Sequence, residues 1–107
     1  MSHHEHVTTP WSNRSLHLRW TWDPDRDKIN RRKHLLPLSV GEVALADPCA
    51  MSQRNPHPGH HRADTVCMAG GVLLFIVHTW PHADDAPGHI ISIRKATRLE
   101  RRAYEDG

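Results

Sequence analysis

The sequence predicts an α+β domain in which helices pack against an antiparallel sheet of about four strands. Three observations support this prediction. Apolar and polar residues alternate at residues 18–22, three longer strand-like segments occupy residues 62–95, and helix-capping patterns mark helices outside them. Along the chain these elements follow the order β-α-α-β-β-β-α, which is typical of a sheet with helices packed against it.

A single domain is expected, because 107 residues can enclose one modest core. Residues 1–17 show no hydrophobic period, so we expect them to form a disordered tail and residues 18–107 to form the folded domain. Leu18, Trp20 and Trp22 alternate with polar residues and predict the first strand.

The first helix is predicted to start at Pro24 and to end near His34. Asp23 offers a side-chain acceptor at the N-cap, and Pro24 has no N–H to lose at the first helical position. The acidic residues of this segment precede the basic ones, as the helix dipole favours. The segment is mostly polar, and Ile29 is its expected apolar anchor.

A second, shorter helix is predicted over residues 40–46. Ser39 and Glu42 have the spacing of a capping box, and the pair Asp47-Pro48 ends the segment. Residues 49–61 are polar and rich in His and Pro, so we expect a loop there.

Three further strands are predicted at residues 62–69, 72–80 and 89–95. Gly70 and Gly71 separate the first two strands and suit a tight hairpin turn, because such a turn needs positive φ angles. These strands supply most of the expected sheet.

A last helix is predicted over residues 98–105. Thr97 and Glu100 again have the spacing of a capping box. Leu99 and Ala103 are expected on the inner side of this helix.

Lys and Arg residues concentrate near the two ends of the predicted domain, although the net charge is only +2. Seven of the 14 lie between residues 14 and 33, and five more lie between residues 94 and 102. If these ends meet in space, they form a cationic patch suited to phosphates. Two separate, solvated helix faces would give the same distribution.

Cys49 and Cys67 are expected to be free thiols, because their spacing is neither that of a metal site nor that of a redox motif. The apolar run at residues 72–77 is too short to span a bilayer, and the N-terminus shows no export signal. We therefore expect a cytoplasmic protein that does not contact membranes.

Several short motifs follow one another along the domain. They are Trp22-Asp23, Asn30, Lys33-His34, Asp47-Pro48, Val77-His78-Thr79, the run from Ile90 to Thr97, Glu100-Arg101 and Tyr104. Together they resemble the BrnT family of toxins from type II toxin–antitoxin systems, over roughly residues 18–106. The resemblance implies a RelE-like fold and a toxin that inhibits growth by cleaving RNA. It also implies a BrnA-like ribbon-helix-helix antitoxin, a 2:2 complex, and contact with DNA only through that antitoxin.

The resemblance further implies RNA cleavage without a metal ion or cofactor, in which a ribose 2′-OH attacks the neighbouring phosphate. Arg62 and Arg94 match family positions, and as catalytic residues they would stabilise the charged phosphorane. In the last strand, Ile91 and Ile93 are expected to face the core, which places Arg94 on the opposite face.

Two histidines complete the candidate catalytic set. His34 ends the first predicted helix, where the helix dipole favours a protonated ring, and it is the candidate general acid. His78 is a candidate base. The residues expected to bind the RNA backbone, which gives affinity without base selectivity, are Lys33, Lys95, Arg98 and Arg101.

Each candidate also has a structural interpretation. The arginines would pair with an acid such as Asp64 or Asp47, His34 would cap its helix, and His78 would fill the core. The basic residues of the last helix would meet the antitoxin rather than RNA.

Two other classes of function remain open. A degenerate toxin would bind antitoxin or RNA without cutting, and His60, which stands where the family often has an acidic residue, favours this reading slightly. A metal-binding protein would use His57, His60, His61 and His89, but no Cys or carboxylate completes this set.

Overall fold

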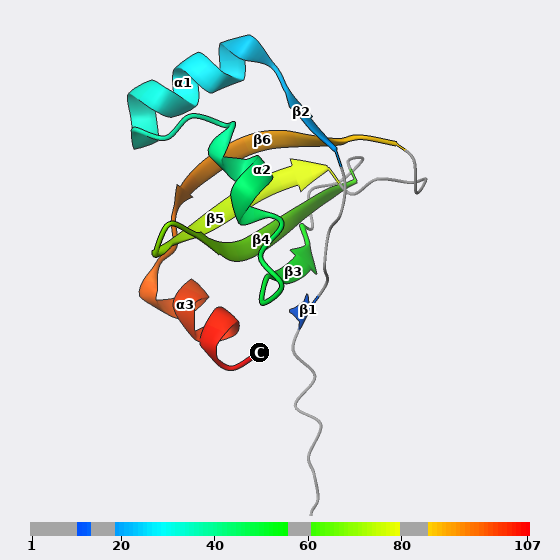
Figure 1. Cartoon of the computed structure of the whole chain (residues 1–107), viewed down its shortest axis with the longest axis vertical. Helices are drawn as coiled ribbons and strands as arrows, with labels where there is room; N and C mark the ends of the chain where they lie inside the picture. Colours follow the sequence, from blue (N-terminus) through cyan, green and yellow to red (C-terminus); the bar gives the residue numbers. More distant parts are fainter. Residues whose placement is uncertain (1–10, 14–18, 56–60, 80–85) are drawn as a thin grey trace, which may run out of the picture.

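The computed structural model describes residues 11–13, 19–55, 61–79 and 86–107, and these residues form three helices and a six-stranded mixed sheet (Figure 1). Across the sheet the strands lie in the order β1-β3-β4-β5-β6-β2. The elements are β1 (Ser12–Asn13), β2 (Trp20–Trp22), α1 (Pro24–His34), α2 (Val40–Ala44), β3 (Met51–Arg54), β4 (Arg62–Ala69), β5 (Val72–Thr79), β6 (Gly88–Lys95) and α3 (Arg98–Glu105). The α+β class is confirmed, whereas the expectation of about four antiparallel strands is wrong.

The first predicted strand, β2, runs parallel to the last strand, β6. Trp20 lies opposite Gly88 and Trp22 lies opposite Ile90. The parallel pairing is allowed because α1, α2 and the three central strands intervene in the chain, so no tight turn joins β2 to β6. β2 therefore lies beside the start of β6, whereas the second basic segment begins at Arg94, near the other end of this strand.

Two strands were not predicted. The expectation of a loop over residues 49–61 is wrong at β3, which pairs antiparallel with β4. β1 extends the sheet beyond β3, and the side-chain amide of Asn13 donates to the carbonyl oxygens of Pro48 and Ala50 at 3.1 and 2.8 Å. Residues 1–10 and 14–18 lie outside the described residues, so the disorder of the remaining tail stays a prediction.

The predicted hairpin of β4 and β5 is confirmed. Gly70 and Gly71 have φ angles of 56° and 79°, as a turn that matches the twist of the two strands requires. All residues of the two strands are paired, from Arg62 with Thr79 to Ala69 with Val72.

A β-bulge interrupts β6 beside β5. Val77 pairs with Ser92, whereas the next residue, His78, pairs with Ile90, so Ile91 is the extra residue. The bulge locally breaks the alternation of side chains along β6.

Because of the bulge, Ile90 and Ile93 both point into the core and are fully buried. The prediction that Ile91 faces the core is therefore wrong. Arg94 does lie on the face opposite Ile93, as expected, with its guanidinium over the ring of Phe75.

α1 and α3 start with the predicted caps, but α2 does not. The Asp23 side chain accepts from the N–H of Asp25 at 2.9 Å, and Thr97 and Glu100 form a reciprocal capping box. Ser39 has helical angles itself (φ −61°, ψ −25°) and makes no side-chain cap bond. A capping side chain needs an extended backbone at that position. α2 starts at Val40 as predicted but ends at Ala44 rather than at residue 46.

Two apolar anchors were predicted wrongly, because Ile29 is 56% exposed and Leu99 is 75% exposed. Asn30 fixes α1 instead. Its side-chain amide donates to the carbonyl oxygens of Ile93 and Leu36 at 2.9 and 2.8 Å, and its Oδ1 accepts from the Ile93 N–H at 2.9 Å.

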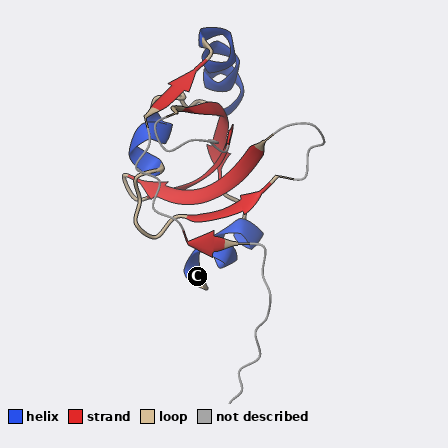
Figure 2. Cartoon of the chain, turned by 90° about the vertical axis from the view of Figure 1, so that its right-hand side faces the viewer, coloured by secondary structure: helices blue, strands red, loops and turns tan. Residues whose placement is uncertain are grey.

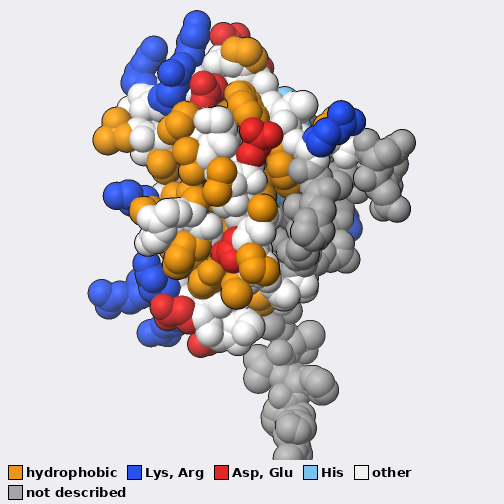
Figure 3. Space-filling view, in the orientation of Figure 1, with side chains coloured by type: hydrophobic (Ala, Val, Ile, Leu, Met, Phe, Trp, Pro, Cys, Tyr) orange, Lys and Arg blue, Asp and Glu red, His pale blue; other side chains and the backbone are white. Residues whose placement is uncertain are grey.

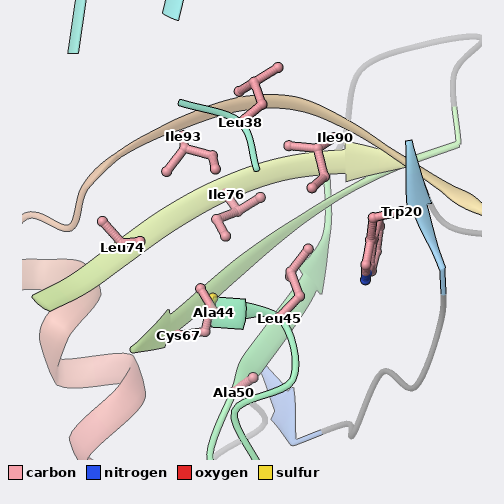
Figure 4. Close-up of a cluster of buried hydrophobic side chains, with 10 residues drawn as sticks. All are labelled: Trp20, Leu38, Ala44, Leu45, Ala50, Cys67, Leu74, Ile76, Ile90 and Ile93. Carbon is pink, nitrogen blue, oxygen red and sulfur yellow. The ribbon is translucent and has the colours of Figure 1, made fainter. Parts of the chain in front are cut away.

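The core lies between one face of the sheet and α2, which crosses that face (Figures 1 and 2). Its buried side chains are Trp20, Leu38, Ala44, Leu45, Ala50, Cys67, Leu74, Ile76, Ile90 and Ile93 (Figure 4). Both cysteines are free, as predicted, and burial raises the pKa of the Cys67 thiol, so this group stays protonated at neutral pH.

Strand alternation turns another set of side chains away from this core. We call that side of the sheet the second face, and it carries Arg62, Asp64, Phe75, Val77 and Arg94.

Candidate active site

Arg94 is held flat against Phe75 on the second face. Its guanidinium carbon lies 4.1 Å from the centroid of the Phe75 ring, within the range of a cation–π contact. Its two terminal nitrogens, Nη1 and Nη2, donate to Oε1 and Oε2 of Glu100, each at 2.8 Å. The fork-like pairing fixes the orientation of the guanidinium, while 35% of the Arg94 side chain stays exposed.

Glu100 links Arg94 to the start of α3. Oε1 of Glu100 also accepts from the N–H of Thr97 at 2.9 Å, within the capping box. Burial of Glu100 opposes its ionisation, but hydrogen bonds from Arg94 and Thr97 lower its pKa below the ordinary value. The bond to Glu100 raises the pKa of Arg94 in turn, so the pair is fully ionised at neutral pH.

Arg62 lies on the second face at the start of β4. It is paired with Thr79, whereas Arg94 is paired with Phe75, so the two arginines flank β5 and are offset by about 13 Å along it. Arg62 is half-buried and forms no ion pair within the described residues. The structure thus brings the two predicted arginines to one face.

Asp64 lies between these arginines, and its carboxylate accepts hydrogen bonds from two amide side chains. It is 6% exposed and accepts from the side chains of Asn55 and Gln53 at 2.8 and 3.3 Å. In the described part of the chain it forms no ion pair with Arg62 or Arg94. The alternative that an acid pairs with the arginine is confirmed for Arg94, but the partner is Glu100.

Asp47, the other predicted partner of the arginines, holds separate segments of the chain together. Its Oδ2 accepts from the N–H of Met68 at 2.9 Å and from the hydroxyl of Tyr104 at 2.8 Å. Its Oδ1 accepts from the N–H of Cys49 at 2.9 Å. This carboxylate therefore anchors α3 to the C-terminal end of β4.

His78 lies on the core side of the sheet, not on the second face. Its Nδ1 donates to the carbonyl oxygen of Thr79 at 2.8 Å, and its Nε2 is 2.6 Å from the hydroxyl of Thr65, which is in turn 2.7 Å from that of Ser52. The ring meets Trp20 edge-on, with centroids 5.0 Å apart. Burial lowers the pKa of His78 to about 4, so its ring is neutral at neutral pH.

Lys33 and His34 lie at the end of α1, beside a groove of about 230 Å³ between α1 and β6. The groove is lined by Arg26, Ile29, Asn30, Lys33, His34, Ile91 and Ser92. Ser92 pairs with Val77, so the groove opens beside the second face.

Lys95 and Arg98 are exposed near the start of α3, and Arg101 is exposed one turn further. Arg101 lies 3.7 Å from the carboxylate of Glu105. In Figure 3, basic side chains gather over α1 and near α3, with hydrophobic surface between them. On this face the basic side chains therefore do not form one continuous patch.

No three His, Cys, Asp or Glu side chains of the described segments gather as a metal ion requires. His57 and His60 lie outside those segments, and His89 contacts the hydroxyl of Thr21 at 3.0 Å. In the part of the chain that the structure describes, no helix has the length and apolarity to cross a membrane.

Sequence reasoning missed the roles of Glu100, Phe75 and Asn30. Glu100 was recognised only as a helix cap. Phe75 could have been found by alternation, because it is the aromatic residue between core positions Leu74 and Ile76. Asn30 was noted only as a motif residue, because its hydrogen bonds to Ile93 involve a distant strand.

Comparison with protein families identifies a family to which most of the chain is similar. A family model described as "Ribonuclease toxin, BrnT, of type II toxin-antitoxin system" matches residues 22–100. The matched segment spans α1 through the start of α3, and it includes Arg62, Arg94 and Glu100. No curated protein matches the chain.

Proposed function

Because the chain belongs to the BrnT family of ribonuclease toxins from type II toxin–antitoxin systems, we propose that it cleaves RNA by attack of a ribose 2′-OH on the neighbouring phosphate. The reaction needs no metal ion or cofactor. In the cytoplasm, cleavage inhibits growth until a BrnA-like ribbon-helix-helix antitoxin binds the toxin in a 2:2 complex. The α+β sheet is of the RelE-like type, and the toxin reaches DNA only through the antitoxin.

The observation that carries this proposal is the fixed guanidinium of Arg94 on the same face as Arg62. Phosphorane formation adds negative charge, and preorganised donors stabilise that charge without reorganising during the reaction. Glu100 and Phe75 hold Arg94 in one orientation while its outer side stays exposed. Arg62 supplies a second cation on the other side of β5.

His34 acts as the general acid in this proposal, and His78 has a structural role. His34 lies at the negative end of α1 and borders the groove that opens beside the second face. His78 is fully buried on the other side of the sheet and is neutral. RNA backbone contacts come from Lys33, Lys95, Arg98 and Arg101, which are exposed on α1, β6 and α3.

The test is cleavage of single-stranded RNA, with and without ribosomes, by purified protein. Arg94→Ala and Arg62→Ala should each slow cleavage about 100-fold, equivalent to about 3 kcal/mol in the barrier. Arg54→Ala, which removes an exposed arginine of β3, is the matched control and should stay within about twofold of the wild type. EDTA should not change any of these rates. Circular dichroism melting checks that each variant is folded.

The pH profile tests His34 separately. His34→Gln should remove the alkaline limb of the pH–rate profile if this residue is the acid, because the rate falls at high pH as a general acid loses its proton. An unchanged profile would leave His34 as a helix cap and remove it from the mechanism.

A binding module without catalysis is the alternative, and the ion pair of Arg94 with Glu100 is the observation that favours it. The charge of Arg94 is already partly neutralised in this pair. If the wild type cuts no RNA and does not slow growth without its antitoxin, the binding module replaces the nuclease.

A further inference from the structure

The groove between α1 and β6 is built from one face of a helix and one bulge. The α1 residues that line it are Arg26, Ile29, Asn30, Lys33 and His34. Their spacing of three and four residues places them on a single stripe of the helix. The opposite wall is Ile91, which the bulge leaves out of the regular pairing, and its neighbour Ser92.

Two isoleucines give this groove apolar walls. Ile29 is 56% exposed, although the rest of its helix is polar, and Ile91 is the residue displaced from the core by the bulge. An exposed apolar side chain beside a second one in a concave site indicates contact with a ligand.

The rim of the groove is cationic. Arg26 and Lys33 are exposed and His34 is half-buried, and within the described segments none of them forms an ion pair. No Asp or Glu is among the described residues that line the groove. The rim therefore suits an anion.

The two walls are held at a fixed spacing. Asn30 is 3% exposed and bridges α1 to both the N–H and the carbonyl oxygen of Ile93. Because these hydrogen bonds join the helix to the strand directly beneath the groove, little reorganisation accompanies binding.

We propose that this groove binds one nucleotide of the RNA substrate, next to the nucleotide that is cleaved. The base lies between Ile29 and Ile91, and its flanking phosphate contacts Arg26 and Lys33. The inference rests on the proposed nuclease function, and it adds a subsite to it. RNA fits better than an acidic protein segment, because Ser92 connects the groove to the face of Arg94 and Arg62, and because a volume of about 230 Å³ suits a single base.

Binding of a fluorescein-labelled single-stranded RNA of about ten nucleotides tests this subsite. The probe carries 2′-O-methyl groups, so it cannot be cut, and affinity is measured by anisotropy at several salt concentrations. Arg26→Glu should weaken binding about tenfold and should flatten the salt dependence. Arg32→Glu changes the same net charge on the exposed side of α1, outside the groove, and should weaken binding only about twofold.

A series of probes with one abasic position tests the apolar walls. In the wild type, removing the base at one position of the probe should lower the affinity about fivefold. In Ile29→Ala, removing the base at that position should cause no further loss of affinity, because the base no longer contacts the side chain of residue 29. Val43→Ala, at an exposed residue of α2 away from the groove, should reproduce the wild-type series.

The outcomes separate the subsite from the nuclease. Equal losses in Arg26→Glu and Arg32→Glu, or an abasic series that is the same in Ile29→Ala and the wild type, would overturn the subsite while cleavage by the wild type still supports the nuclease. Failure of the wild type to bind any probe would overturn the subsite. Absence of cleavage with intact, Arg26-dependent binding would reject the nuclease and keep the nucleotide site. Loss of antitoxin binding in Arg26→Glu and Ile29→Ala, with RNA binding unchanged, would assign the groove to protein docking instead.

Discussion

At the scale of single residues, the carboxylate of Glu100 has two structural roles. It closes the capping box of α3 and holds the guanidinium of Arg94 over Phe75. A substitution at Glu100 therefore affects both the start of α3 and the orientation of the candidate catalytic guanidinium of Arg94. The two effects can be separated by experiment.

Glu100→Gln should lower kcat about tenfold without raising KM. The amide cannot pair with both arms of Arg94, so the guanidinium loses its fixed orientation, but its charge is no longer neutralised and binding is retained. Thr97→Ala is the control, because it removes one capping hydrogen bond and leaves the ion pair in place. It should cost about 1 kcal/mol of stability and leave kcat unchanged. Equal kcat values for Glu100→Gln and the wild type would refute the positioning role.

His78 should make the protein less stable in weak acid. Its pKa is about 4 in the folded protein and about 6.5 when the chain unfolds, so only the unfolded chain takes up a proton between these values. The free energy of unfolding should fall by about 1 kcal/mol between about pH 7.5 and about pH 5.5, and should continue to fall toward pH 4. Urea denaturation at each pH measures it. In His78→Gln this part of the slope should vanish, and an identical slope in both proteins would contradict the assignment.

At the scale of elements, the hairpin between β4 and β5 depends on its turn. Gly70 has φ 56°, and a Cβ added there would meet no atom within 4 Å. The cost of a side chain at this position is therefore backbone strain alone, which makes the turn a clean test of conformational preference.

Gly70→Asn should leave stability unchanged within about 0.5 kcal/mol, because Asn tolerates the left-handed region and precedes Gly in favoured turns of this kind. Gly70→Val should cost about 2 kcal/mol, because a β-branched residue is strained there. Thermal melting of the two variants measures the difference. Equal melting temperatures would mean that the turn can change its type.

The elements that the sequence predicted well carry their own local signals. Asp23-Pro24, Thr97 with Glu100, and Gly70-Gly71 each specify a backbone geometry within four residues, and all three are confirmed. The elements that were missed depend on distant partners. β3 is four residues of mixed polarity, and it is a strand because β4 pairs with it.

The candidate site also combines features that have a local sequence signal with features that depend on distant partners. The arginines were predicted from motif and strand parity, and the structure places both on the second face. The groove was not predicted, because it depends on a β-bulge for which β6 carries no sequence signal. It also depends on Asn30, whose partner on β6 is 63 residues away. Ile29 was assigned to the core for the same reason: an apolar residue on a helix does not reveal which surface it meets.

At the scale of the whole molecule, β1 and Asn13 extend the sheet at one edge. Deleting residues 1–14 removes β1 and the two hydrogen bonds that the Asn13 side chain donates, and it leaves the β3 edge unpaired. We expect a loss of about 1 kcal/mol and a drop of about 5 °C in Tm. Deleting residues 1–10 is the control and should not change Tm, since that segment has no apolar period. Equal Tm values for both deletions would show that β1 adds nothing to stability.

Because α1 and β2 both lie beside β6, which is made late, the order of synthesis determines when the candidate site can form. Ribosomes make the chain from its N-terminus, so α1 emerges well before the strand beneath it. Asn30 has no Ile93 to bind until 63 more residues have been added. Until then α1 carries its cations without the opposite wall of the groove, and Arg94 has not yet been made. A nascent chain that stops before β6 therefore lacks Arg94 and one wall of the groove, both of which the proposed cleavage uses.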